Sequence, residues 1–239
     1  RLAGRVAARR SGQEAPIPTP WENVNRALGG GVWPGLHVLV GATGAGKSQL
    51  AMQLALHAAK TAGVPVLYLA LELDAFGLFC RAVATLAWGR VREEDGRPAS
   101  PQWSALYTGA ADVPPFAVAE LEALPFRWLE APPHGFGYDA LAPAVEALRA
   151  EHNTAGPVML VVDFLQLVSS PDTREELRER IGHASYACRA IARELNAVVL
   201  ALSSTARRPP GDKVLTVEGG DDGSYRRTAR PDGWSASPK

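Results

Sequence analysis

The sequence has few of the features that mark secreted, membrane or zinc-stabilised proteins. It contains 2 cysteines in 239 residues, Cys80 and Cys188, which lie far apart and lack CxxC spacing. This argues against a disulfide framework or a zinc site, and we expect two buried free thiols. No apolar run reaches membrane-spanning length, and the arginine-rich start lacks the apolar stretch of a signal peptide. We therefore expect a cytoplasmic protein without a membrane contact.

The chain also lacks an excess of charge of either sign. Its 25 Lys and Arg residues balance its 25 Asp and Glu residues, so the formal net charge is zero. No global basic field indicates nucleic acid, and any such surface must be local. With 46% hydrophobic residues, a chain of this length predicts one globular α/β domain with a sizeable core.

One eight-residue motif of the form GxxxxGK[ST] indicates a phosphate-binding loop. An apolar run at residues 36–40 precedes it, and a helical pattern at residues 49–60 follows it. In such a loop the backbone N–H groups surround a polyphosphate, the lysine reaches the β- and γ-phosphates, and the hydroxyl binds Mg²⁺. The motif therefore predicts a nucleotide site with ATP and Mg²⁺ as ligands. Its residues are Gly41, Ala42, Thr43, Gly44, Ala45, Gly46, Lys47 and Ser48.

Strand-like and helix-like segments alternate along the chain. This order predicts a doubly wound, mostly parallel sheet with helices on both faces and ligands at the carboxyl ends of the strands. The expected strands are residues 36–40, 65–71, 126–130, 158–163 and 197–202. The expected helices are residues 21–28, 49–60, 74–88, 141–149 and 175–195, with residues 90–115 rich in loops. Residues 1–10 form either a short basic helix or a frayed terminus.

The predicted strands end on residues that suit a nucleotide site. Asp163 follows five apolar residues, a pattern typical of a carboxylate that supports Mg²⁺ opposite the Ser48 hydroxyl. Alternatively, Asp163 only caps the turn after a buried strand. Glu72 follows the second strand and could act as general base, or it is a solvated carboxylate. Ser203 and Ser204 end the last strand, where a hydroxyl could sense the γ-phosphate or simply form a turn.

These segments resemble the RecA-fold ATPase domain of DnaB-family replicative DNA helicases. The segment YLALEL at residues 68–73, with Arg81 following, is similar to the family's FSLEM. DFLQL at residues 163–167 is similar to DYLQL, and ALSSTAR at residues 201–207 is similar to ALSQLNR. The lead-in at residues 17–35 and the helix at residues 185–195 match as well. The resemblance covers about residues 17–208, in the family's order.

The resemblance implies a RecA-like P-loop NTPase that hydrolyses ATP with Mg²⁺, moves along single-stranded DNA and unwinds duplexes. It implies that Glu72 and Lys47 are catalytic, and that subunits form a homo-oligomer, expected to be a hexameric ring around the DNA. Arg207 and Arg208 follow the last strand, where arginines can bind a DNA backbone without reading its sequence.

The chain departs from the family pattern in two places. Ser204 stands where the family has a glutamine, and a serine cannot offer the donor and acceptor of an amide. Residues 209–239 are rich in Gly, Pro, Asp and Ser, with only residues 214–217 resembling a strand, so we predict an irregular, flexible or incomplete segment. We thus divide the chain into a basic linker at residues 1–16, a RecA-like core at residues 17–208 and this segment. An alternative function is a non-unwinding RecA-like ATPase that regulates assembly on DNA or on a protein partner.

Overall fold

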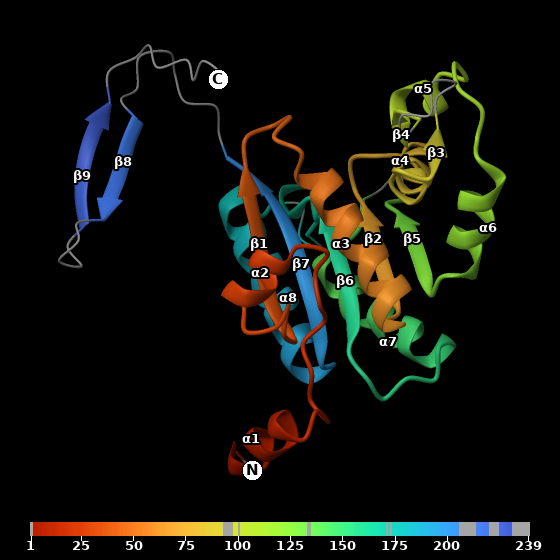
Figure 1. The fold of residues 1–239 in the computed structure, drawn as a ribbon. Helices are drawn as coiled ribbons and strands as arrows, with labels where there is room; N and C mark the ends of the chain where they lie inside the picture. Colours follow the sequence, from red (N-terminus) through yellow and green to blue (C-terminus); the bar gives the residue numbers. More distant parts are fainter. Residues whose placement is uncertain are drawn as a thin grey trace. The chain divides into compact units, whose positions relative to one another are not determined.

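The computed structural model shows two compact units, residues 1–204 and 205–239 (Figure 1). It describes residues 2–92, 98–99, 101–132, 135–170, 172, 174–205, 214–219 and 225–230. Among these residues, no helix is long and apolar enough to cross a membrane.

The first unit is built on a five-stranded parallel sheet in the order β1-β7-β6-β2-β5. Its strands are β1 (Gly35–Gly41), β2 (Val66–Ala70), β5 (Phe126–Glu130), β6 (Val158–Asp163) and β7 (Ala197–Ser204). All five expected strands are present, and the predicted strand at residues 126–130 has the observed bounds. The parallel α/β fold predicted from the alternation of segments is therefore confirmed.

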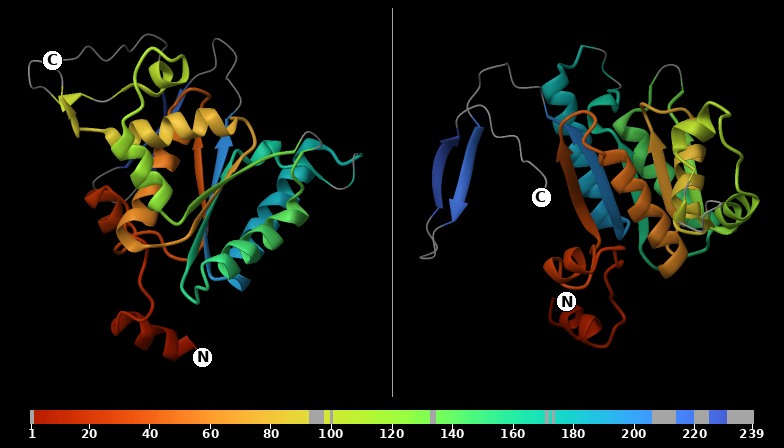
Figure 2. Two further views of the ribbon diagram at one scale, coloured as in Figure 1. Left: turned by 90° about the vertical axis from the view of Figure 1, so that its right-hand side faces the viewer. Right: turned by 45° about the horizontal axis from the view of Figure 1, so that its top comes forward.

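Helices cover both faces of the sheet (Figure 2). The face with α3 (Lys47–Ala62), α4 (Ala75–Ala87) and α6 (Pro115–Ala123) holds one hydrophobic core cluster. The face with α7 (Leu141–Glu151) and α8 (Leu177–Glu194) holds the other. The strand β2 is buried throughout, and its residues alternate between the two clusters, as a strand covered on both sides requires.

The helix ends follow local sequence signals. Gly46 (φ 85°) precedes helix α3 and Gly63 (φ 60°) follows it, both in the left-handed conformation that favours glycine. The Asp74 side chain caps α4 by accepting a 2.7 Å hydrogen bond from the backbone N–H of Gly77. The shorter described elements are α1 (Leu2–Arg10), α2 (Glu22–Ala27), β3 (Val91–Arg92), β4 (Pro98–Ala99), α5 (Trp103–Tyr107), and the 3₁₀ turns η1 (Tyr138–Ala140) and η2 (Leu165–Leu167). Of the two readings of residues 1–10, the helix is the one observed.

The lead-in to β1 is held by a short antiparallel bridge between Ile17 and Val32. Their backbones exchange hydrogen bonds of 2.9 and 2.8 Å. Gly31 (φ 147°) lies beside this bridge, where a Cβ atom would come 2.2 Å from the Ile17 carbonyl oxygen. Only glycine therefore fits there without a shift of the backbone.

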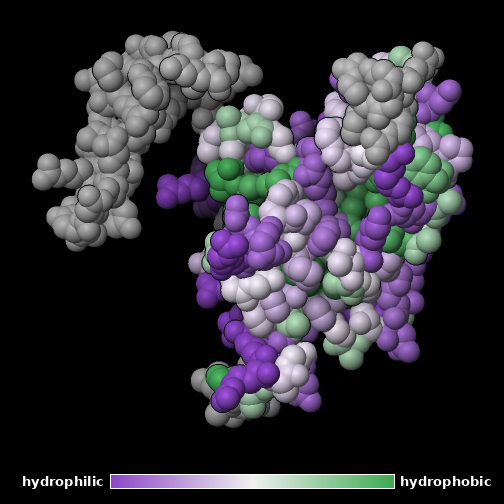
Figure 3. All heavy atoms as spheres, in the orientation of Figure 1, coloured by the Kyte–Doolittle hydropathy of each residue, from purple (hydrophilic) through white to green (hydrophobic). Residues whose placement is uncertain are grey.

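The first unit has exposed apolar residues on one strand and two buried cysteines. Val38 and Val40 in β1, which is an edge strand of the sheet, are exposed, and Figure 3 shows a hydrophobic patch over the carboxyl end of β1. Cys80 and Cys188 are both buried and free, as predicted from their spacing.

The described part of the second unit forms one antiparallel pair, β8 (Val214–Gly219) and β9 (Tyr225–Arg230). β8 includes residues 214–217, which had strand character in the sequence. β9 was not predicted because its sequence, YRRTAR, shows no alternation of apolar and polar residues. Backbone hydrogen bonds pair the two strands, and such pairing does not depend on that pattern.

Candidate functional site

The phosphate-binding loop joins the end of β1 to the start of α3. Gly44 (φ 81°) and Gly46 (φ 85°) have left-handed backbones, which the motif's glycines allow without strain. The first backbone N–H groups of the 16-residue helix α3 follow directly at Lys47 and Ser48. A helix N-terminus behind a glycine-rich turn is a ready anion-binding site.

Lys47 lies within the curve of this loop. Its Nζ atom donates hydrogen bonds of 2.9 Å to the Gly41 carbonyl oxygen and 3.0 Å to the Ala42 carbonyl oxygen. The ammonium group is therefore held by two neutral acceptors at the base of the loop, which phosphate oxygens can replace with a stronger, charge-assisted interaction.

The loop forms one wall of a cleft of about 280 Å³. The cleft brings together residues that the sequence placed at the ends of different strands: Glu72 after β2, Asp163 at the end of β6 and Ser204 at the end of β7. Its full lining is Thr43, Gly44, Gly46, Lys47, Ser48, Gln49, Glu72, Arg81, Asp163, Phe164 and Ser204. Ser203 lies beside this group. Arg207 and Arg208 fall outside the described residues, so their expected DNA contact stays a prediction.

Asp163 is a buried carboxylate with a dedicated partner. It is 4% exposed, and its Oδ2 atom accepts a 2.7 Å hydrogen bond from the hydroxyl of Tyr68 on the neighbouring strand β2. Burial, and then the charge of Asp163, raise the pKa of Tyr68 well above its ordinary value, so this hydroxyl remains a donor. Tyr68 thus orients the carboxylate, a role that its place in an otherwise aliphatic strand could have suggested.

Arg81 is a site residue whose role the sequence alone did not indicate. It comes from α4, nine residues after the exposed Glu72, and lines the same cleft. Its guanidinium carbon lies 3.9 Å from the centroid of the Trp103 ring, while its buried Nε atom has no hydrogen-bond partner among the described residues. Stacking on an indole leaves the guanidinium donors in their plane available to an anion.

Gln166 is a second residue missed as a site residue, although it belongs to the DFLQL segment. It lies on η2, three residues after Asp163, and its Nε2 atom donates hydrogen bonds of 2.9 Å to Ser203 Oγ and 3.0 Å to the Ser204 carbonyl oxygen. The turn after β6 is therefore tied to the end of β7.

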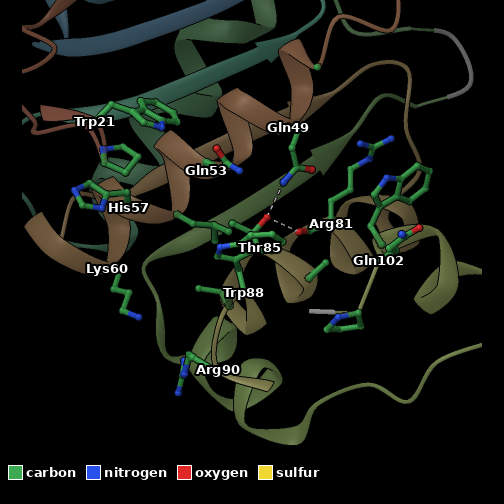
Figure 4. A pocket seen from close by; sticks show the side chains of 17 residues that line it. Trp21, Gln49, Gln53, His57, Lys60, Arg81, Thr85, Trp88, Arg90 and Gln102 are labelled. Carbon is green, nitrogen blue, oxygen red and sulfur yellow. Dashed lines mark hydrogen bonds between the residues drawn. The ribbon is translucent and has the colours of Figure 1, made fainter. Parts of the chain in front are cut away.

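A larger cleft of about 640 Å³ adjoins the first between α3 and α4 (Figure 4). Gly46, Gln49 and Arg81 line both clefts. Gln49 Nε2 donates a 2.9 Å hydrogen bond to Thr85 Oγ1, which in turn donates to the Arg81 carbonyl oxygen at 2.7 Å. These two hydrogen bonds fix α4, and with it Arg81, against α3, the helix that follows the phosphate loop.

The carboxylates and cations of the described residues do not form a separate metal centre. Among them, no group of three or more His, Cys, Asp or Glu side chains is arranged to hold a metal ion. The side chains with oxygen atoms that line the cleft at the phosphate loop include Ser48 and Asp163, which the sequence predicts as the Mg²⁺ ligands, together with Thr43, Glu72 and Ser204.

A phosphate loop at the end of β1, with carboxylates at the ends of β2 and β6, defines a P-loop NTPase with a RecA-like sheet. The chain belongs to the family described as DnaB-like helicase C terminal domain, whose model matches residues 16–212. The resemblance found in the sequence is thereby confirmed.

Solved structures show the same fold. One, described as "The Structure Of A DnaB-Like Replicative Helicase And Its Interactions With Primase", superposes with a TM-score of 0.66 at 17% identity over 86% of this chain. The chain covers 48% of that structure's chain, or about half its length. Another, described as an ATPase domain, has a TM-score of 0.65 at 16% identity over 86% of this chain and is itself covered to 70%. Comparison with curated protein sequences gives no match.

Proposed function

We propose that this chain is the motor domain of a DnaB-like DNA helicase, which hydrolyses ATP with Mg²⁺ to move along single-stranded DNA and unwind duplexes. The observation that carries the proposal is the single cleft in which the phosphate loop meets Glu72, Asp163, Arg81 and Ser204. Four separate stretches of the chain converge on the place where a terminal phosphate lies when the loop holds a nucleotide.

The donor set at the loop fits Mg²⁺. A small, hard cation is usually held by one or two carboxylates together with hydroxyl groups, waters and substrate phosphates. Here Ser48 and Asp163 are the residues to hold it, with the Asp163 carboxylate oriented by Tyr68. When bound, Mg²⁺ neutralises charge on the phosphates of the substrate.

The remaining side chains have separable roles. Lys47 exchanges its two carbonyl partners for phosphate oxygens and stabilises charge on the transferred group. Glu72 orients or deprotonates the attacking water. Arg81, held over Trp103, donates to the phosphates from the same cleft and stabilises the charge that develops during transfer.

We extend the proposal to assembly and to DNA. ATP lies at interfaces between subunits of a ring, expected to be a hexamer, with single-stranded DNA in the centre and Arg207 and Arg208 on its backbone. The basic helix α1 packs on a neighbouring subunit, and deletion of residues 1–15 should then abolish ring assembly in analytical ultracentrifugation. Unchanged assembly would reject this role for α1.

A second function is supported by one residue. Ser204 has a shorter side chain than the family's glutamine at the end of the last strand, so coupling between nucleotide and DNA can be lost while hydrolysis is kept. The chain is then a RecA-like ATPase that regulates assembly on DNA or on a protein partner without unwinding.

Parallel assays of forked-DNA unwinding and of DNA-stimulated ATP hydrolysis separate the two functions. Unwinding supports the motor, and stimulated hydrolysis without unwinding supports a regulator that acts on DNA. The absence of both rejects the motor and points to a partner other than DNA.

Two variants test the site itself. Lys47→Ala should lower kcat/KM by about 10²- to 10³-fold, whereas Lys60→Ala, on the same helix and outside the phosphate cleft, should not. Glu72→Gln should keep nucleotide binding and lose about 10²- to 10⁴-fold in kcat. Its matched control is Glu151→Gln, an exposed carboxylate on α7. Normal turnover by Glu72→Gln would remove that residue from its catalytic role.

A further inference from the structure

Among the described residues, the end of β7 has a strand neighbour on one side only. β7 pairs with β6 from Val158↔Ala197 as far as Val162↔Ala201. On its other side β7 continues to pair with β1 until Gly41↔Ser204, where the phosphate loop begins. Ser203 and Ser204 therefore project beyond the last residue of β6 that pairs with β7, because the chain turns into η2 after Asp163.

The side chain of Gln166 takes the place that β6 leaves. Its amide nitrogen donates 3.0 Å to the Ser204 carbonyl oxygen, and its Oε1 atom lies 3.4 Å from the Ser204 backbone nitrogen as an acceptor. Its nitrogen also donates 2.9 Å to Ser203 Oγ. One amide thus contacts both polar groups of the Ser204 backbone, as a neighbouring strand would.

This clasp reaches the phosphate site from two directions. Ser204 lines the cleft with Lys47 and Asp163. The register partner of Ser204 is Gly41, whose carbonyl oxygen accepts a hydrogen bond from Lys47. From α8, Arg180 donates a 3.4 Å hydrogen bond to the Gln166 carbonyl oxygen and so supports the turn that carries it.

We infer that Gln166 is a positioning residue that holds Ser204 against the terminal phosphate of the bound nucleotide, so that the site distinguishes ATP from ADP. The inference rests on the proposed function. Gln166 does not itself line the phosphate cleft among the described residues, so it acts through Ser204. Because η2 follows directly on the Asp163 strand, the clasp also joins the Mg²⁺ side of the site to the end of β7.

The test measures affinity for ADP and for ATPγS, an analogue that is hydrolysed slowly, by competition with a fluorescent nucleotide. Gln166→Ala removes the clasp, so the ratio of ATPγS affinity to ADP affinity should fall about 5- to 20-fold, as the loss of one or two hydrogen bonds predicts. Affinity for ADP should stay within about twofold, because the loop alone binds the two inner phosphates. Gln53→Ala, a partly buried glutamine on α3 outside the phosphate cleft, is the matched control and should leave the ratio unchanged.

A double-mutant cycle with Ser204→Ala tests whether Gln166 acts through Ser204. If it does, the double variant should have the same ratio as the more affected single variant, whereas independent effects multiply. A Gln166→Ala protein that binds both nucleotides as the wild type does, or loses affinity for both equally, overturns the inference. So do multiplicative effects in the cycle.

Two further outcomes are distinguishable from these. If Gln166→Ala does not fold, Gln166→Glu is measured by the same criterion, because it keeps the size of the side chain but loses the donor to the Ser204 carbonyl oxygen. If the wild-type chain binds neither nucleotide, the proposed function itself is rejected, together with the role of Gln166 that depends on it.

Discussion

Among the residues that the structure describes, the Tyr68 hydroxyl is the only hydrogen-bond donor to the buried Asp163 side chain, and Tyr68→Phe removes that one oxygen. The Tyr68 ring is fully buried and lies 6.4 Å from the Phe126 ring, centroid to centroid. A phenylalanine keeps this packing, so the variant isolates the hydrogen bond to the Asp163 carboxylate.

The size of the effect follows from the charge and burial of the acceptor. A hydrogen bond to a charged group contributes about 1.5–3 kcal/mol, and a carboxylate that is only 4% exposed cannot replace the lost donor with bulk water easily. We therefore expect the free energy of unfolding to fall by about 1.5–3 kcal/mol at pH 7. Tyr186→Phe is the matched control, because Tyr186 is 71% exposed on α8, and should change stability by less than about 0.5 kcal/mol.

Urea unfolding of both variants and of the wild type measures these differences, from the midpoint at an unchanged slope. A loss below about 0.5 kcal/mol in Tyr68→Phe would refute the reasoning that Asp163 depends on this donor. A second measurement concerns function. If Tyr68 orients the carboxylate toward Mg²⁺, the Mg²⁺ concentration for half-maximal ATP hydrolysis should rise about 10-fold or more in Tyr68→Phe. An unchanged Mg²⁺ requirement with lowered stability would limit Tyr68 to a structural role.

Three other predictions concern stability and reactivity. Because the folded pKa of Tyr68 is raised, the stability it contributes is present below the unfolded value of 10.0 and is lost as pH rises above it. Unfolding free energy should therefore decline above about pH 10 in the wild type, and less steeply in Tyr68→Phe. Burial raises the pKa of the Cys80 thiol, and it raises the pKa of the Cys188 thiol to about 12. Neither thiol should therefore react with Ellman's reagent at pH 8 until urea unfolds the chain. Rapid labelling of the native protein would contradict this prediction. In thermal unfolding, Gly31→Ala should destabilise the folded protein by more than about 1 kcal/mol, because the new Cβ atom would meet a backbone oxygen. Gly182→Ala on α8, where a Cβ atom meets open space, should instead stabilise it by about 0.5–1 kcal/mol. Equal effects of the two substitutions would be inconsistent with strain at Gly31.

The sequence was sufficient for the five strands of the main sheet and for the phosphate-binding loop. Short apolar runs such as residues 158–162 favour buried strands, and a loop that surrounds a phosphate anion requires glycines and a lysine at the spacing found here. The same local signals placed Glu72 and Asp163 at strand ends, and the DFLQL segment identified the family. The sequence did not predict β9, because its residues do not alternate between apolar and polar and it is paired through backbone hydrogen bonds.

The partners of these residues required the tertiary structure. Tyr68 and Asp163 are 95 positions apart, and they meet only because the sheet places β6 next to β2. Likewise Gln166 reaches Ser204 because β7 lies between β1 and β6 and extends beyond the last residue of β6 that pairs with it. Arg81 faces the phosphate loop because α4 packs beside α3.

Local elements could be predicted from the sequence and long-range contacts could not, for a physical reason. A strand, a helix or an anion-binding loop is specified by residues within a few positions of one another, so its signal is local and can be read from the chain. Strand order and the contacts between strand ends depend on how two core clusters are buried at once on opposite faces of one sheet. The sequence by itself determined that this protein has a P-loop, a parallel sheet and carboxylates at strand ends; only the tertiary structure decided which side chains orient them.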